Sequence, residues 1–283
     1  MPKNYLITGG AGFIGSHLTD KLVSKGHKVR VFDNLDRQAH PDLKKDVFLN
    51  SQAEFVKGDV CDKKKLEQAL NGIDYVFHLA AAVGVEQSMT NLNYYVKNNS
   101  LGTANLLELL ASKEHNVKKI VVASSMSTYG EGLYTCKNCG LIEPSLRNEK
   151  QLKEKKWEVE CTNCGNSVLP VATPESKSQE PNSIYGITKK DQEDMTLLIG
   201  KTYGIKAVAM RYFTVIGPRQ PPLNPYTGVI KIFLQKIMNN EQPIVFEDGL
   251  QSRDFISVHD VVNANISVMN SSAADYESFN VGT

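Results

Sequence analysis

A glycine-rich segment near the amino terminus restricts the possible folds more than any other feature of this sequence. It reads Thr8-Gly9-Gly10-Ala11-Gly12-Phe13-Ile14-Gly15 and lies between an apolar run and an amphipathic stretch. Glycines at this spacing permit a tight turn, the close approach of a pyrophosphate, and close packing of a helix against a strand. The free N–H groups at the start of that helix would face the phosphates. The segment predicts a strand–turn–helix unit that binds a dinucleotide; a tight turn without a ligand is the alternative.

Strand-like and helix-like segments alternate on both sides of a polar interruption. Apolar runs typical of strands occupy residues 5–8, 28–33, 53–57, 75–80, 119–124 and 207–212. Stretches typical of helices occupy residues 13–25, 63–70, 94–113, 184–203 and 229–238. A strand followed by a helix is expected to begin within 254–260. This rhythm predicts the α/β class, with a doubly wound parallel sheet of the Rossmann type whose strands are covered on both faces.

Composition and charge exclude several other classes of protein. The chain has 283 residues, 41% of them hydrophobic, and a formal net charge of +1. So small a charge gives no overall field toward nucleic acid or a membrane surface, and no run reaches the roughly 20 apolar residues that span a bilayer. The first apolar run is too short for a signal peptide, and five cysteines cannot all pair in disulfides. We expect a cytoplasmic protein whose partner is neither nucleic acid nor a membrane.

Two aspartates that follow strand-like runs are candidates for contacts with a nucleotide. Asp33 ends the second run, and a carboxylate there accepts hydrogen bonds from ribose hydroxyls and repels a 2′-phosphate. It therefore favours NAD over NADP, although the nearby Arg37 could weaken this preference; a turn at the strand end is the alternative. Asp59 could accept a hydrogen bond from the adenine amino group or, almost as readily, cap the helix expected at 63–70.

Three further residues form a candidate acid–base site. Tyr185 and Lys189 are four residues apart on an expected helix and therefore share a face. An ammonium beside a phenol lowers the pKa of the phenol, which can then act as a base or an acid near neutral pH. Ser124 and Ser125 end a strand at the carboxyl edge of the sheet, where ligands bind in such folds. A serine hydroxyl there could hold the reacting oxygen.

Taken together, the motifs resemble the extended short-chain dehydrogenase/reductase family, in its NAD-dependent sugar-nucleotide epimerase/dehydratase branch. The segments that carry the resemblance are TGGAGFIGSHL at 8–18, GDV at 58–60, HLAA at 78–81, SSMSTYG at 124–130, YGITK at 185–189, RYFTVIGPRQ at 211–220 and SRDFISVHDVV at 252–262. The resemblance implies a nucleotide-sugar substrate, and a catalytic triad of Ser125, Tyr185 and Lys189.

The resemblance also implies residues for each ligand. Besides the tyrosine and lysine of the triad, the residues expected to contact NAD are Gly9, Gly12, Phe13, Ile14, Asp33, Asn34, Asp59, Val60, Leu79, Ala80, Ala81, Asn99 and Phe213. The residues expected to contact the substrate are Ser125, Thr214, Arg219 and Arg253. A guanidinium matches phosphate oxygens, so the two arginines are expected to hold the diphosphate; salt bridges at the surface are the alternative. Thr214 stands where many members of the family carry Asn, which removes one expected polar contact.

The reaction expected is epimerisation, by resemblance at C4 of the sugar and through a transient keto intermediate. Family dehydratases carry an Asp-Glu pair directly after the active-site Ser or Thr, and this chain has Met126-Ser127 there. These side chains cannot protonate a leaving hydroxyl at neutral pH. By resemblance, the substrate is expected to be dTDP-L-rhamnose or a UDP-hexose. The alternatives are a dehydratase, reductase or decarboxylase on the same scaffold, or a non-catalytic NAD-binding scaffold protein.

The polar interruption contains two closely spaced cysteine pairs. Cys136 and Cys139, then Cys161 and Cys164, are each followed by glycine. Two such pairs are typical of a closed, structural Cys₄ zinc site; local disulfides or a redox pair are the alternatives. Zinc would fold an insertion that has too little apolar content to fold alone.

The family resemblance also gives a domain organisation. We expect an NAD-binding Rossmann domain from residues 1–132 and 173–211, a zinc-ribbon insertion at 133–172, and a substrate-binding lobe at 212–283 that is incomplete at its carboxyl end. We also expect a homodimer, because two helices at one edge of the sheet often pair across a dimer in this family. The apolar stretch 101–110 and the helix at 184–203 are the candidates.

Overall fold

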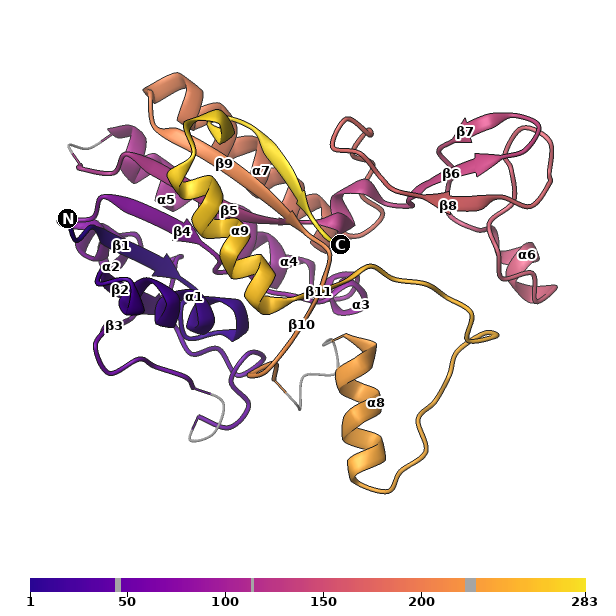
Figure 1. Cartoon of the computed structure of the whole chain (residues 1–283), viewed down its shortest axis with the longest axis horizontal. Helices are drawn as coiled ribbons and strands as arrows, with labels where there is room; N and C mark the ends of the chain where they lie inside the picture. The colour runs from indigo at the N-terminus through magenta and orange to yellow at the C-terminus, as the bar shows by residue number, and fades with distance from the viewer. Residues whose placement is uncertain (44–46, 113–114, 222–227) are drawn as a thin grey trace.

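The computed structural model describes residues 1–43, 47–112, 115–221 and 228–283. Within these residues the centre of the molecule is a seven-stranded sheet with the order β12-β9-β5-β4-β1-β2-β3 (Figure 1). Every pairing in this sheet is parallel. The strands are β1 (Asn4–Thr8), β2 (Lys28–Asp33), β3 (Glu54–Lys57), β4 (Tyr75–His78), β5 (Lys119–Ser125), β9 (Lys206–Tyr212) and β12 (Ser278–Val281). The predicted doubly wound parallel sheet is confirmed.

Helices cover both faces of the sheet, and alternate residues of each strand enter different cores. Tyr5 and Ile7 pack with residues of α1 (Phe13–Ser24) and α9 (Val258–Asn270). Leu6, between them, packs on the other face with residues of α2 (Lys63–Leu70) and α5 (Gly102–Ser112). The long helix α7 (Ile184–Tyr203) also lies on that second face, against β5 and β9. Strands buried on both faces explain why their sequences are almost continuously apolar.

The helix expected at 94–113 is interrupted, and its last residue lies outside the described ones. The short helices α3 (Val85–Ser88) and α4 (Leu92–Tyr95) are followed by a π-helical segment, η1 (Val96–Leu101), and then by α5. Asn99 in this segment is buried, accepts a hydrogen bond from Ala82 N at 2.7 Å and donates one to Thr188 Oγ1 at 2.9 Å. The wide turn therefore presents a polar side chain to the interior, which apolar periodicity cannot reveal.

The cysteine-containing segment folds separately at one end of the molecule (Figure 1). In it, β6 (Leu133–Cys136) pairs antiparallel with β7 (Gly140–Ile142) and with β8 (Leu169–Val171). A short helix, α6 (Glu149–Lys153), follows β7. This segment is called the ribbon below, with the bounds 133–172.

The last part of the chain, the range expected to form a substrate lobe, divides between two places. Beside the sheet, β10 (Thr214–Ile216) pairs with β11 (Phe255–Ser257), and α8 (Val229–Met238) stands apart from them. By contrast, α9 packs on the central sheet and β12 extends it, because both carry apolar residues into its core. Two short turns, η2 (Met126–Tyr129) and η3 (Ser272–Ala274), complete the described elements. Among the described helices, none is both long and apolar enough to cross a bilayer.

Candidate active site

A cavity of about 430 Å³ opens at the carboxyl ends of the central strands. It lies where the strand order reverses, since β1 has β2 on one side and β4 on the other, and this is the usual ligand position in doubly wound sheets. The predicted residues that line it are Gly9, Gly12, Phe13, Ile14, Asp33, Asn34, Val60, Leu79, Ala80, Ala81, Ser125, Tyr185, Lys189, Phe213 and Thr214. One cavity thus collects residues from six of the seven motif segments, all except 252–262.

In the glycine-rich turn at 8–15, close packing leaves no room for a side chain at two positions and leaves space at a third. A Cβ on Gly9, whose φ is +70°, would lie 2.8 Å from Ala80 N, and one on Gly15 would lie 2.3 Å from Gly9 O. A Cβ on Gly12 would meet only Gly9 O, at 3.3 Å. Gly12 also precedes α1 without a side-chain cap, so the first N–H groups of the helix face the cavity. This turn fits the pyrophosphate of a dinucleotide.

Asp33 lies at the wall of the cavity next to this turn. Its carboxylate accepts hydrogen bonds from Ala11 N at 3.1 Å and Leu35 N at 2.9 Å, and His40 Nε2 lies 3.7 Å away. These contacts fix a buried carboxylate where a nucleotide ribose would bind, which fits NAD.

Asp59, in contrast, does not line the cavity in the described residues. It accepts hydrogen bonds from Asn34 Nδ2 at 3.0 Å and Cys61 N at 2.8 Å. Burial raises the pKa of Asp59, but these hydrogen bonds outweigh burial and lower it overall. Its carboxylate holds Asn34, which does line the cavity, and the expected contact of Asp59 itself with an adenine stays a prediction.

The three residues of the expected triad meet at the opposite end of the cavity. The Ser125 side chain lies close enough to the Tyr185 phenol to oppose, in part, the rise of the Tyr185 pKa. Lys189 Nζ donates to Ala123 O at 3.0 Å and lies 6.0 Å from the centroid of the Tyr185 ring. Helix α7 holds this geometry: its cap Ser183 accepts a hydrogen bond from Gly186 N at 3.1 Å.

The protonation of these groups differs from the expectation. Burial raises the pKa of Tyr185 to about 12, and the Ser125 side chain only partly opposes it. Burial lowers the pKa of Lys189 to about 7. The prediction that Lys189 lowers the Tyr185 pKa is therefore wrong for the protein without a ligand, because the enclosed cavity disfavours both charged forms.

Three residues expected at the ligands lie elsewhere. Asn99 is buried behind Ala82, with its amide occupied within the protein. Arg219 forms an ion pair with Asp20 at 2.7 Å, and Arg253 donates to Ser252 O at 2.7 Å near the surface. None of the three lines the described cavity. For Arg219 the geometry matches the alternative, a salt bridge at the surface. Arg253 has neither a contact with the cavity nor a salt bridge among the described residues.

The cavity also has walls that no motif announced. Gln38, Tyr94 and Asn98 line it. Gln38 Nε2 donates to Val83 O at 2.8 Å, which closes the wall between two loops far apart in sequence. Because these residues meet only through tertiary contacts, the sequence carried no local signal for them.

Burial keeps His78 and Cys61 in their uncharged forms. His78 is buried between Thr8 Oγ1, 2.7 Å from Nδ1, and Thr103 Oγ1, 2.9 Å from Nε2. Burial lowers its pKa to about 3, and burial raises the pKa of Cys61 to about 11. Neither supplies a charge or a thiolate near neutral pH.

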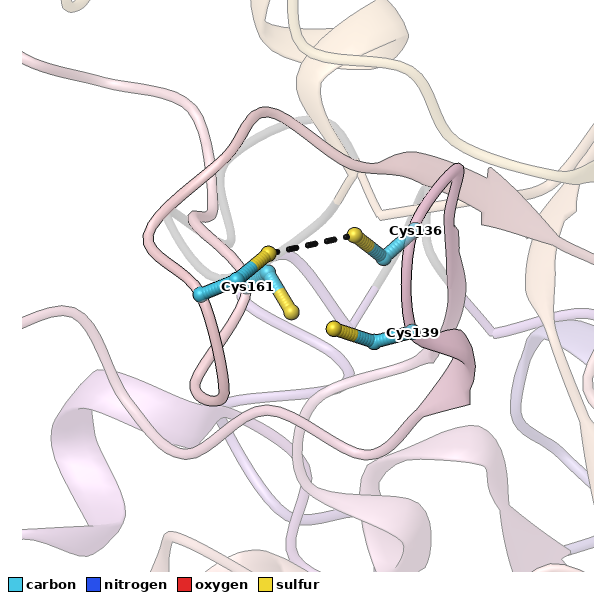
Figure 2. Close-up of side chains that lie close together, drawn as sticks. Cys136, Cys139 and Cys161 are labelled. Atoms are coloured by element: carbon cyan, nitrogen blue, oxygen red, sulfur yellow. Dashed lines mark hydrogen bonds between the residues drawn. The ribbon is translucent and has the colours of Figure 1, made fainter.

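The paired cysteines come together in the ribbon (Figure 2). The sulfur atoms of Cys136, Cys139, Cys161 and Cys164 all lie within 4.8 Å of one another, and none of them is in a disulfide. Cys136 Sγ and Cys164 Sγ are 3.6 Å apart. A tetrahedron with zinc–sulfur bonds of about 2.3 Å has edges of about 3.8 Å, so the four thiols fit a zinc ion.

Comparison with known proteins decides the family. The sequence profile of the NAD-dependent epimerase/dehydratase family matches residues 5–147 and 165–282. The chain belongs to this family. The internal stretch that is not matched, 148–164, lies within the ribbon, so this part of the ribbon departs from what members of the family share.

Individual members of the NAD-dependent epimerase/dehydratase family are similar over most of their length. A putative UDP-glucose 4-epimerase of Methanocaldococcus jannaschii is 36% identical over 94% of this chain and 73% of its own length. A dTDP-L-rhamnose 4-epimerase of Burkholderia thailandensis is 30% identical over 99% of this chain and 77% of its own length. The structure of UDP-glucose 4-epimerase from Thermotoga maritima with UDP-glucose has a TM-score of 0.78 and 34% identity, over 99% and 77%. The structure of UDP-glucuronic acid 4-epimerase from Bacillus cereus with UDP-glucuronic acid and NAD has a TM-score of 0.72 and 28% sequence identity, and the match covers 99% of this chain and 77% of that one.

Proposed function

We propose that this protein is an NAD-dependent epimerase that inverts a carbon, C4, of a nucleotide-diphosphate sugar through a keto intermediate. The observation that carries the proposal is the meeting of Ser125, Tyr185 and Lys189 at one end of a cavity whose other end fits NAD. The 4-epimerase relatives support the choice of carbon. Their names also support a UDP-hexose or dTDP-L-rhamnose as the substrate.

Each residue of the triad has a separate task. The Ser125 hydroxyl holds the oxygen of the reacting sugar hydroxyl. Tyr185 Oη removes the proton from that hydroxyl and later returns it to the new alcohol. Lys189, on the same face of α7, stabilises the phenolate when it carries its proton. NAD, when bound, would supply the reversible hydride acceptor. Its positive charge would favour the phenolate of Tyr185, whose pKa is about 12 in the ligand-free protein.

The composition of the cavity favours epimerisation over dehydration. Among the residues that the structure describes, the carboxylates that line the cavity are Asp33 and Asp36, both at the nucleotide end. Met126 occupies the wall directly after Ser125. Elimination of water needs an acid beside the leaving hydroxyl, and this wall offers none; epimerisation needs no such acid.

The test is Tyr185→Phe in a panel of UDP-, dTDP-, GDP- and CDP-sugars followed by NMR. Removal of the phenolic oxygen is expected to lower kcat at least about 100-fold, because positioned acid–base groups contribute about 10²–10⁴. NAD content after purification should stay the same. Full turnover by Tyr185→Phe, or a wild-type protein that binds NAD and converts no sugar nucleotide, would contradict the proposal.

We further propose that the four ribbon cysteines bind a structural zinc ion. Four protein thiols close a tetrahedral site and leave no position for a substrate. Free thiols held this close are consistent with a reducing compartment such as the cytoplasm.

For the assembly, we propose a homodimer formed through α5 and α7. Leu101, immediately before α5, is 48% exposed, and Ile187 and Leu198 on α7 are 43% and 64% exposed. Burial of apolar side chains on neighbouring helices is a usual basis of homodimers.

A further inference from the structure

The ribbon touches the rest of the molecule at a place far from its own base. Arg147, after β7, lies 3.2 Å from each carboxylate oxygen of Glu247. Glu247 belongs to the loop that runs from α8 to β11, residues 239–254, which lies on the ribbon's side of the molecule (Figure 1). The two side chains are 30% and 20% exposed, so water screens the pair only in part.

Each partner of this pair is fixed on its own side. Arg147 Nη1 also donates to Trp157 O at 2.6 Å, which joins it to the second half of the ribbon. Glu247 also accepts a hydrogen bond from Gln251 Nε2 at 2.7 Å, which closes the turn of the loop. Glu247 has a φ of +57°, a left-handed conformation that a residue other than glycine adopts only when its surroundings hold it.

The same loop leads directly to the cavity. Asp254, at its end, accepts a hydrogen bond from Thr214 N through its carbonyl at 3.1 Å, and Thr214 lines the cavity. Arg253 precedes it. Burial raises the pKa of Tyr134, in the ribbon strand β6, and the positive charges of Arg253 and Arg147 oppose that rise. Arg253 therefore lies within electrostatic reach of the ribbon.

We propose that Arg147 and Glu247 are positioning residues through which the ribbon holds the 239–254 loop, and thereby sets the position of Thr214 in the cavity wall and the affinity of the site for its nucleotide substrate. This inference rests on the proposed function for the identity of the ligand. Neither residue touches the cavity, so the effect acts through the loop and leaves the NAD end of the cavity unchanged.

Hydrogen exchange and UDP binding test the proposal together. The primary variant is Glu247→Gln, which removes the charge and leaves the Arg147–Trp157 bond intact. We expect exchange of the amides of 244–253 to become about two- to fivefold faster, the range for a partly exposed ion pair. The Kd for UDP and the KM for UDP-glucose should rise by a similar factor, with kcat and NAD affinity unchanged. The matched control is Glu149→Gln, which breaks the exposed Lys153–Glu149 pair of the same ribbon and should change none of these values.

A charge exchange distinguishes a specific pair from general damage. Arg147→Glu is expected to weaken UDP binding, and Arg147→Glu with Glu247→Arg is expected to restore it toward the wild-type value. Unchanged exchange in Glu247→Gln, faster exchange with unchanged UDP affinity, or no recovery in the double variant would each overturn the proposal. A wild-type protein that converts no sugar nucleotide would refute the proposed function alone, because the exchange and UDP measurements need no turnover.

Discussion

The burial of Lys189 destabilises the folded protein, although the proposed reaction needs this lysine. Its side chain is buried, and loss of solvation lowers its pKa from an ordinary value near 10.5 to about 7. Between these two pH values the unfolded chain holds a proton that the folded chain lacks, so stability rises with pH across this window. Below about pH 7 the folded protein must hold a buried charge, and the cost to stability is fully present.

Replacement of this lysine is therefore expected to stabilise the cofactor-free protein while it removes activity. Lys189→Met should raise the free energy of unfolding by about 1–4 kcal/mol at pH 6.5, after allowance for the lost bond to Ala123 O. This increase in the free energy of unfolding should vanish near pH 10. Urea unfolding at the two pH values measures it, and the more exposed Lys190→Met is the control, expected within about 0.5 kcal/mol of wild type. A less stable Lys189→Met at pH 6.5 would show that the ammonium is better solvated than the structure indicates.

The sequence located site residues well where a motif is local and poorly where a partner is distant. Gly9, Asp33 and Tyr185 lie at the cavity because a turn, a strand end and a helix face fix them within a few residues. Arg219 does not lie at the cavity, because it pairs with Asp20 on a different element. The local sequence around either residue cannot predict an ion pair between distant segments. The pKa of Tyr185 was also misjudged, since burial depends on the whole cavity and spacing along a helix does not report it.

Elements with clear boundary signals were predicted to the residue. Helix α7 spans 184–203 as expected, with Ser183 as its cap and Gly204 in the left-handed conformation at its end. The bounds of the helix expected at 94–113 were not predicted correctly, because the π-helical part of this segment is stabilised by the Asn99 contacts with Ala82 and Thr188 and not by local sequence signals. Nor was the contribution of β12 to the central sheet foreseen, since strand order depends on contacts between distant segments.

The βα turn allows the binding and folding roles of glycine to be separated. Gly12→Ala places a methyl group with one neighbour, Gly9 O at 3.3 Å, whereas the methyl of Gly15→Ala would lie 2.3 Å from the same oxygen. We expect Gly12→Ala to keep its melting temperature within a few degrees and to bind NAD at least about tenfold more weakly. Gly15→Ala should lose about 1–3 kcal/mol of stability from overpacking. Thermal melts and NAD titration by calorimetry measure both, and equal losses in the two variants would refute the distinction.

The ribbon is an element whose own core is too small to fold without help. Its buried cluster consists of Cys136, Ile142, Val159, Cys161 and Val168, with Tyr134 packed against it. Cys139→Ser is expected to abolish zinc retention and to unfold the ribbon, so that trypsin cuts faster after Lys150 and Lys153, whose side chains are already exposed, while the central sheet stays protected. Zinc is measured by atomic absorption, and Cys61→Ser is the control that keeps the metal. A wild-type protein purified without chelators that holds no zinc, or a ribbon equally resistant in both variants, would exclude the metal's structural role.

At the scale of the whole molecule, one buried network joins the sheet, α7 and the segment that leaves the ribbon. Arg211 on β9 donates to Glu193 on α7 at 2.6 Å, to Tyr129 Oη at 2.6 Å and to Glu175 O at 3.0 Å. Ser278 on β12 donates to Glu193 at 2.9 Å. Glu193 thus lies one helical turn beyond Lys189 and ties the catalytic helix to the edge of the sheet.

This network is expected to make the stability of the protein sensitive to acid. Burial raises the pKa of Glu193, but the bonds and charge of Arg211 outweigh it, so the pKa lies below its ordinary value of 4.5. A lowered carboxyl pKa contributes stability that is present above about pH 4.5 and is lost as the pH falls through the folded pKa. Glu193→Gln leaves Arg211 as an unpaired buried charge and should cost about 3–5 kcal/mol at pH 7.

The pH dependence of this difference separates the charge of Glu193 from its shape. In urea unfolding, the difference in stability between wild type and Glu193→Gln should be widest near pH 7. It should narrow below about pH 4.5, where the unfolded wild-type chain takes up a proton, and should be lost as the pH falls through the lowered pKa of the folded carboxyl. Glu54→Gln is the matched control: its pair with Arg30 has a carboxylate that is 57% exposed, and such pairs contribute about 0–1 kcal/mol. A difference that stays constant from pH 7 to pH 3 would mean that packing around the side chain, and not its charge, holds these elements together.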